Sequence, residues 1–143
     1  MQPSGRVSAG LGPTSPQFAE NMPNDPAPRI SQQNGVTVIE LGPEFENLDE
    51  HVLEAIREPV LESASTADPP RVVLDLSHTR FFGSAFIELL FRAYNRVNER
   101  EGGVFALSGL TEYCAEVIAV THLDRLWKVY PTRAAAVKAL SAG

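Results

Sequence analysis

The stretch RVVLDL, residues 71–76, most constrains what this chain can fold into. Four of its six residues are aliphatic, and they do not alternate with polar residues. Such a run is typical of a strand that is buried on both faces, as in the centre of a parallel sheet. Because parallel neighbours cannot be joined by tight hairpins, the strand predicts long crossover connections, usually helices.

Helical and strand patterns alternate on both sides of this run. Strand patterns occupy residues 29–33, 36–41, 104–110 and 126–131, and helical patterns occupy residues 46–65, 84–100, 111–120 and 133–142. The predicted order is therefore β-β-α-β-α-β-α-β-α, with helices packed against a mainly parallel central sheet. Asn34 and Gly35 separate the first two strands and predict an antiparallel hairpin at one edge of that sheet.

Local signals refine the predicted helix ends. Asn47 and Glu50 have the spacing of a capping box at the start of the first helix. Pro59 lies inside the same pattern, and we expect it to kink this helix or to end it early. Thr111 and Thr132 are each placed to cap a later helix, since their hydroxyls can accept from early backbone N–H groups.

Residues 1–28 differ from the rest of the chain. They carry six of the eleven prolines, several glycines and serines, and few large apolar side chains. Such a segment cannot bury enough surface to offset its ordering entropy. We therefore expect a disordered leader over residues 1–28 and one folded domain over residues 29–143.

The charge balance excludes several kinds of partner and site. The net charge of −6 argues against binding to nucleic acids or anionic membranes, which need clustered lysines and arginines. No apolar run approaches the ~18 residues of a membrane span, and no secretion signal is visible, so we expect a cytoplasmic protein. Cys114 is the single cysteine and the three histidines are far apart, so we predict a buried Cys114, no disulfide, no metal site and no cofactor.

Enzyme motifs are likewise not found. No phosphate-binding loop or dinucleotide fingerprint occurs, and FFGSAF matches the G-x-S-x-G pattern only at the serine. A triad of Ser84, His78 and Asp75 can be drawn, but nothing in the pattern places the histidine beside the serine. We therefore predict that the protein is not an enzyme.

Asp75 and Ser84 are the two polar residues that need an explanation. A carboxylate inside VVLDL must find partners, so Asp75 is interpreted as a structural carboxylate that binds donors in the next loop or, alternatively, as part of a phosphate or nucleotide site. Ser84 follows an aromatic pair and a glycine at the start of an apolar helix, where it can cap that helix unless Gly83 does so. A hydroxyl there also lies where a phosphate would meet free N–H groups and the positive helix end.

The sequence from Arg71 to Leu140 resembles a STAS domain of the anti-sigma factor antagonist type. Four features carry the resemblance: the VVLDLS strand, the aromatic lead-in to a serine-bearing turn, the glycine pair before a short strand, and HLDRLWKVYPTRAAAVKAL at the end. Their order and spacing extend the resemblance to residues 29–140. It implies the same β-β-α-β-α-β-α-β-α fold.

The resemblance also implies a role. Domains of this type bind a kinase-type anti-sigma factor and so release a sigma factor. The kinase inactivates them by phosphorylating a serine in a turn usually written D-S-S-G. Here Gly83 takes the place of the aspartate, Ser84 that of the phosphorylated serine, Ala85 that of the second serine and Phe86 that of the glycine. We expect Ser84 to be the phosphoacceptor and Gly83, Ala85, Phe86 and Ile87 to contact the anti-sigma factor or serine kinase partner.

Two alternatives stay open at this stage. Because three of the four turn positions differ from the pattern, the chain can instead be a non-phosphorylated STAS scaffold subunit of a signalling or lipid-transport complex, with Phe86 as an exposed anchor. The other alternative is a small nucleotide-binding domain, which calorimetric titration with ATP and GTP would test. Assembly into a homo-oligomer or a larger signalling complex is not decided by these residues.

Overall fold

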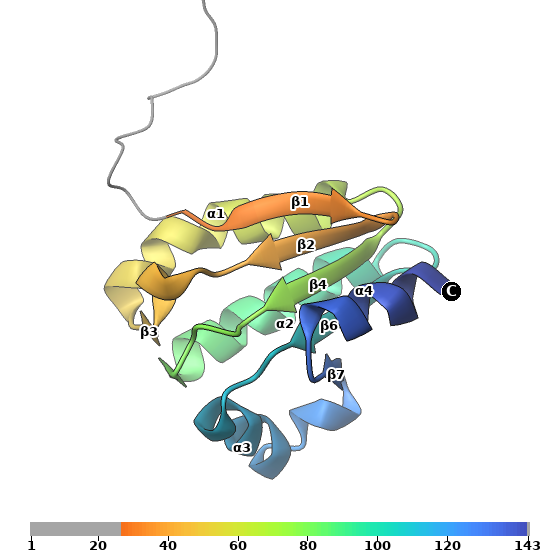
Figure 1. Ribbon diagram of the computed structural model, residues 1–143. Coiled ribbons are helices and arrows are strands. Elements are labelled where there is room, and N and C mark those ends of the chain that lie inside the picture. Colours follow the sequence, from red (N-terminus) through yellow and green to blue (C-terminus); the bar gives the residue numbers. More distant parts are fainter. Residues whose placement is uncertain (1–26, 143) are drawn as a thin grey trace, which may run out of the picture.

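The computed structural model describes residues 27–142, so the predicted disordered leader lies outside the described residues except for its last two positions. A five-stranded sheet forms the centre, in the order β1 (Arg29–Gln33), β2 (Val36–Glu40), β4 (Arg71–Asp75), β6 (Val104–Ser108) and β7 (Lys128–Tyr130). β1 pairs antiparallel with β2, and the other neighbours are parallel (Figure 1). The predicted mainly parallel sheet with one antiparallel edge strand is confirmed.

The hairpin between β1 and β2 forms at the predicted turn. Asn34 and Gly35 have φ angles of 53° and 79°, the left-handed values that a type I′ turn requires at both positions. The turn sets the register in which Gln33 faces Val36. β2 is then buried on both faces, as a strand between two neighbours within a layered domain should be.

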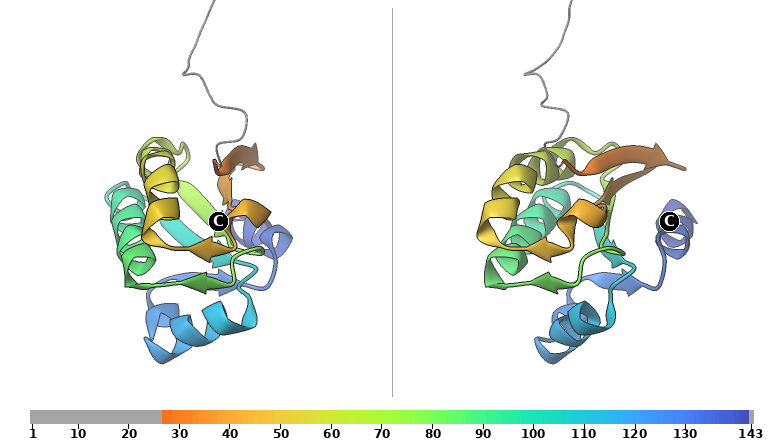
Figure 2. Two further views of the ribbon diagram at one scale, coloured as in Figure 1. Left: turned by 90° about the vertical axis from the view of Figure 1, so that its left-hand side faces the viewer. Right: turned by 60° about the vertical axis from the view of Figure 1, so that its left-hand side comes forward.

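Helices cover both faces of the sheet, as Figure 2 shows. α1 (Glu50–Thr66) and α2 (Ser84–Asn98) lie side by side on one face, and α4 (Arg133–Ala142) lies on the other. α3 (Glu112–Val120) and the short helix η2 (Leu123–Arg125) lead to β7. Alternate residues of β2 supply the two cores, since Val36 and Val38 pack under α4 while Ile39 packs under α1 and α2.

The start of α1 corrects one prediction. Asp49 is the N-cap, and its carboxylate oxygen Oδ1 accepts a hydrogen bond of 2.9 Å from the backbone N–H of Val52. Asn47, the predicted cap, lies instead in the two-residue strand β3 (Asn47–Leu48). The capping-box prediction was therefore wrong, because strand pairing keeps Asn47 two residues before the N-cap.

Pro59 does not end α1 early. The helix continues for seven residues beyond it, to Thr66. Proline removes one backbone donor, but Val60, Leu61 and Ala64 are buried after it. Their burial holds the last two turns in place, so the expectation of an early end was wrong.

The later threonines behave differently from each other. The hydroxyl oxygen of Thr132 accepts from the backbone N–H of Ala135 at 3.1 Å, which confirms its predicted capping role. Thr111 precedes α3 as predicted, but its hydroxyl donates to the carbonyl oxygen of Thr79 at 2.9 Å and makes no capping bond. Thr111 therefore ties the start of α3 to the loop that follows β4.

A second, two-stranded sheet was not predicted. β3 pairs in parallel with β5 (Phe81–Phe82), so Asn47 faces Phe81 and Leu48 faces Phe82. A short helix, η1 (Pro43–Phe45), precedes β3. The backbone N–H groups of Arg80 and Phe81 both donate to the carbonyl oxygen of Glu46, at 2.7 and 3.2 Å. These bonds join the segment before α1 to the segment before α2.

Among residues 27–142, no helix combines the length and the apolar character that crossing a membrane would need.

Candidate functional site

Ser84 is the first residue of α2, and it is exposed. Gly83 is the N-cap, and its carbonyl oxygen accepts from the N–H groups of Phe86 and Ile87 at 3.1 and 3.3 Å. The interpretation of Ser84 as the cap was therefore wrong, and the alternative that assigned this place to Gly83 was right. The Ser84 hydroxyl lies at the end of the helix that favours negative charge.

The residues around Ser84 differ in how far a partner can reach them. Gly83 is exposed, whereas Ala85 and Ile87 are half-buried. The ring of Phe86 is 0% exposed and packs against the ring of Phe82, with 5.1 Å between centroids. Predicting Phe86 as an exposed anchor was wrong, because helical periodicity places it on the buried side of α2 together with Leu89, Leu90, Ala93 and Val97.

Asp75 ends β4 and is 2% exposed. Its Oδ1 accepts from the backbone N–H of Ser77 at 3.2 Å, from the hydroxyl of Ser77 at 2.5 Å and from the hydroxyl of Ser108 at 3.3 Å. Its Oδ2 lies 3.5 Å from Nε of Arg133. Donors in the following loop therefore satisfy this carboxylate, as the structural interpretation predicted.

Arg133 connects Asp75 with a second carboxylate. Its Nη1 lies 3.1 Å from Oε1 of Glu40, on the neighbouring strand β2. The backbone at Gly109 passes close by with φ of +69°, and a Cβ there would collide with the hydroxyl of Ser77. This arrangement anchors the start of α4 across β2 and β4, which is a structural task.

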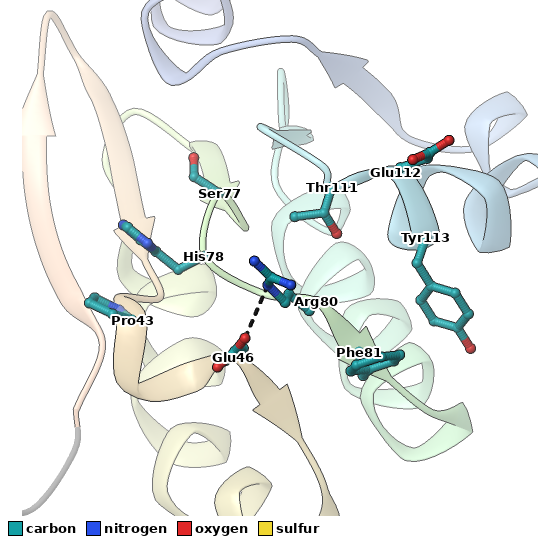
Figure 3. Close-up of a pocket in the computed structure, with 9 residues that line it drawn as sticks. All are labelled: Pro43, Glu46, Ser77, His78, Arg80, Phe81, Thr111, Glu112 and Tyr113. Atoms are coloured by element: carbon teal, nitrogen blue, oxygen red, sulfur yellow. Dashed lines mark ion pairs between the residues drawn. The ribbon is translucent and has the colours of Figure 1, made fainter.

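An open groove of about 560 Å³ lies beyond the carboxyl ends of β4 and β6 (Figure 3). Three segments that are distant in sequence form it: η1 with the residue that follows it, the loop after β4 with the start of β5, and the start of α3. The residues that line it are Pro43, Glu46, Ser77, His78, Arg80, Phe81, Thr111, Glu112 and Tyr113. Ser84 does not line the groove, although it follows Phe81 by only three positions.

An exposed aromatic pair borders this groove and was not predicted. Phe81 is 53% exposed and Tyr113 is 47% exposed, with ring centroids 5.2 Å apart. Both rings are seen beside each other in Figure 3. The adjacent Phe81 and Phe82 offered one signal in the sequence, because neighbours in a strand point to opposite sides and one of them must face outward.

The triad of Ser84, His78 and Asp75 that can be drawn from the sequence is not assembled in the structure. Asp75 and Ser84 do not meet: within residues 27–142, the Asp75 carboxylate is bound by Ser77, Ser108 and Arg133, not by His78. His78 lines the groove and Ser84 does not. In the part of the chain that the structure describes, no three His, Cys, Asp or Glu side chains gather in a way that would hold a metal ion.

Cys114 is 0% exposed, as predicted, and its thiol donates to the carbonyl oxygen of Thr79 at 3.5 Å. Burial raises the pKa of the thiol above its usual range, because the thiolate would lose hydration. We expect the native protein to resist iodoacetamide at neutral pH and to be alkylated rapidly in denaturant. Mass spectrometry after timed quenching checks this, and equal rates in both states would contradict the burial.

Comparison with known proteins places this geometry in a family. The family model of the STAS domain matches residues 27–136 of this chain. The structure of an anti-sigma-factor antagonist (STAS) domain protein from Planctomyces limnophilus is 40% identical, with a TM-score of 0.77 over 80% of this chain and 98% of that chain. An anti-sigma factor antagonist from Mycobacterium paratuberculosis, 23% identical, shares the fold with a TM-score of 0.70 over 83% of this chain and 97% of that chain. The chain belongs to the STAS domain family.

Proposed function

We propose that this STAS domain is an anti-sigma factor antagonist, a non-enzymatic module that binds an anti-sigma factor and thereby regulates transcription in the cytoplasm. One observation carries the proposal: the 40% identical Planctomyces limnophilus protein, an anti-sigma-factor antagonist (STAS) domain protein, is matched over 98% of its length. The fold supports it further, because the turn before α2 is exposed rather than covered by another element.

The proposed binding face is centred on the start of α2. It contains Gly83, Ser84, Ala85 and Ile87, and it continues to Phe81 on β5. Phe81 is the exposed aromatic residue of this turn, and it can take the anchoring role that the sequence predicted for Phe86. Gly83 adds no side chain, and the space around the Cβ that it lacks is open. A partner can therefore approach the backbone of this turn closely.

We further propose that a serine kinase partner phosphorylates Ser84. The hydroxyl is exposed at the first position of α2, where a kinase can reach it. A phosphate adds about −1.5 to −2 charges at neutral pH, and a helix N-terminus accommodates them. On the face formed by Gly83, Ala85 and Ile87, which carry no charge, the phosphate would have to lose its water when a partner binds. Phosphorylation therefore weakens binding without unfolding the domain.

The switch is tested by intact mass after the full chain is incubated with ATP and the kinase that co-purifies with it. We expect one added phosphate on the native chain and none on Ser84→Ala. Ser31→Ala, which removes an exposed hydroxyl on β1, is the matched control and should still gain the phosphate. A phosphate that persists on Ser84→Ala, or that never forms on the native chain, would refute Ser84 as the acceptor.

The non-phosphorylated scaffold subunit is the second candidate. Gly83 and Ala85 favour it, because both stand where the phosphorylated turn usually carries other residues. A constitutive scaffold should bind its signalling or lipid-transport partner equally well before and after Ser84→Asp, whereas a switch should lose affinity. Ser84→Asp therefore separates the two candidates, while Phe81→Ala should weaken binding in both cases and tests the binding face.

A further inference from the structure

The exposed aromatic pair is held in place by the structure around it. β5 pairs with β3, and the pleat sends Phe82 inward, where it is 6% exposed, while Phe81 points outward and is 53% exposed. On α3, Cys114 is buried and Tyr113, one position earlier, is exposed. Two regular elements therefore present the rings, and little ordering is needed before a ligand binds.

Two exposed carboxylates, those of Glu46 and Glu112, line the groove that this pair borders. The segment between β2 and the first turn of α1 carries Glu44, Glu46, Asp49 and Glu50, all exposed. Glu112 adds a further exposed carboxylate at the start of α3, although in Figure 3 it points away from Arg80. These groups make the end of the molecule that holds the groove attractive to a cation.

Few cations on the described residues of this end oppose that charge. Arg80 lies in the groove, and its Nε is paired with Oε2 of Glu46 at 3.0 Å. Arg29 and Arg133 are both paired with Glu40, at 3.9 and 3.1 Å. The guanidinium groups nearby are therefore engaged with carboxylates, and the acidic excess remains. A phosphate or carboxylate ligand would meet repulsion there.

We propose that this groove binds an arginine side chain presented by a segment of the partner protein. The guanidinium lies against the rings of Phe81 and Tyr113, since planar cations are attracted to aromatic faces. It then shares the carboxylate of Glu46, which is 59% exposed, with Arg80, whose Nε lies 3.0 Å from Oε2. This inference rests on the proposed function for the identity of the partner, but the preference of the groove for a guanidinium can be measured without that partner.

The test is an NMR titration of the full, ¹⁵N-labelled chain at low ionic strength. The probe is the blocked tripeptide acetyl-Gly-Arg-Gly-amide, and the control replaces its arginine by citrulline, which has nearly the same shape but no charge. We expect saturable shifts at Phe81, Tyr113 and Glu46 with the arginine peptide, and at least a tenfold weaker response with citrulline. Equal responses to both peptides, or shifts that saturate elsewhere on the chain, would overturn the proposal.

Two variants connect the shifts to the rings. Phe81→Leu and Tyr113→Leu keep apolar bulk but remove an aromatic face, and each should weaken arginine binding by about two- to fivefold, the usual size of an exposed cation–π contact. Val120→Ala changes an apolar side chain on α3 that is 66% exposed and should leave the affinity unchanged. Unchanged affinity in both leucine variants, with their spectra intact, would refute the role of the pair.

Failure of this inference and failure of the proposed function give different results. If the anti-sigma factor binds the chain equally well with and without Phe81→Leu, and the arginine peptide does not bind, the groove is not the site although the function stands. If the arginine peptide binds selectively but no anti-sigma factor is captured, the groove is confirmed while the proposed function is lost.

Discussion

Replacing Phe86 by alanine will lower the free energy of unfolding by about 3–5 kcal/mol, the range for deleting a buried aromatic ring. The ring of Phe86 is 0% exposed and packs against the ring of Phe82, with 5.1 Å between centroids. Because the free energy of unfolding of such a domain is only about 5–15 kcal/mol, the variant will lose a large fraction of its stability. Equilibrium urea unfolding followed by circular dichroism measures the change.

Phe81→Ala is the matched control, since it removes the same ring from the adjacent β5 strand, five positions earlier. Its ring is 53% exposed, so stability should change by no more than about 0.5 kcal/mol. Binding to the partner should instead fall by about thirtyfold or more, as for an interface hot spot. If Phe86→Ala left the free energy of unfolding unchanged, the assignment of Phe86 to the core would be contradicted.

Replacing Asp75 by alanine should lower the free energy of unfolding by about 3 kcal/mol, because hydrogen bonds to a buried charge are lost and a buried hydroxyl is left without a partner. Ser108 is the buried hydroxyl, at 0% exposed, and its contact with Asp75 Oδ1 spans 3.3 Å. Arg133 also loses one of its two carboxylates. Urea unfolding again provides the measurement.

Glu46→Gln provides the control for the Asp75 variant. It breaks the ion pair with Arg80, whose side chains are 59% and 70% exposed, and such pairs contribute between about 0 and 1 kcal/mol. A similar loss of unfolding free energy in both variants would contradict the expectation that the buried contacts of Asp75 stabilise the fold more than the exposed pair does. An additional Asp75→Asn variant keeps the shape of the side chain but removes its charge. The amide oxygen can still accept from the serines, whereas the amide N–H donors would face the Arg133 guanidinium, which has only donors.

The centre of the main sheet and α2 were predictable because both have a strong apolar pattern. RVVLDL has the composition of a doubly buried strand, and the α2 pattern places one apolar stripe opposite charged residues. These signals span five residues or more. The pairing of β3 with β5 involves only two residues on each side, separated by more than thirty positions in the chain, and so leaves no periodicity to detect.

The same pairing explains why the site was predicted only in part. The position of Ser84 at the start of α2 was predicted correctly, because it follows from the apolar pattern of that helix. Whether Phe81 is exposed depends on which residue of β5 faces inward, and whether Phe86 is buried depends on where α2 begins. A shift of one position in β5 or in the start of α2 would reverse the assignment. The groove joins loops from three parts of the chain, and such a meeting is set by the packed fold rather than by any local run of residues.

The antiparallel direction of β1 has a practical consequence for handling the protein. Arg29, where β1 begins, faces Glu40, so the chain enters the domain at the end that holds the groove. The last helix finishes at the opposite end, where Nη1 of Arg71 donates to the carbonyl oxygen of Leu140 at 3.0 Å. A sensor surface or a fluorophore attached after the last helix therefore lies at the end of the domain away from the groove, where it leaves the proposed binding face accessible.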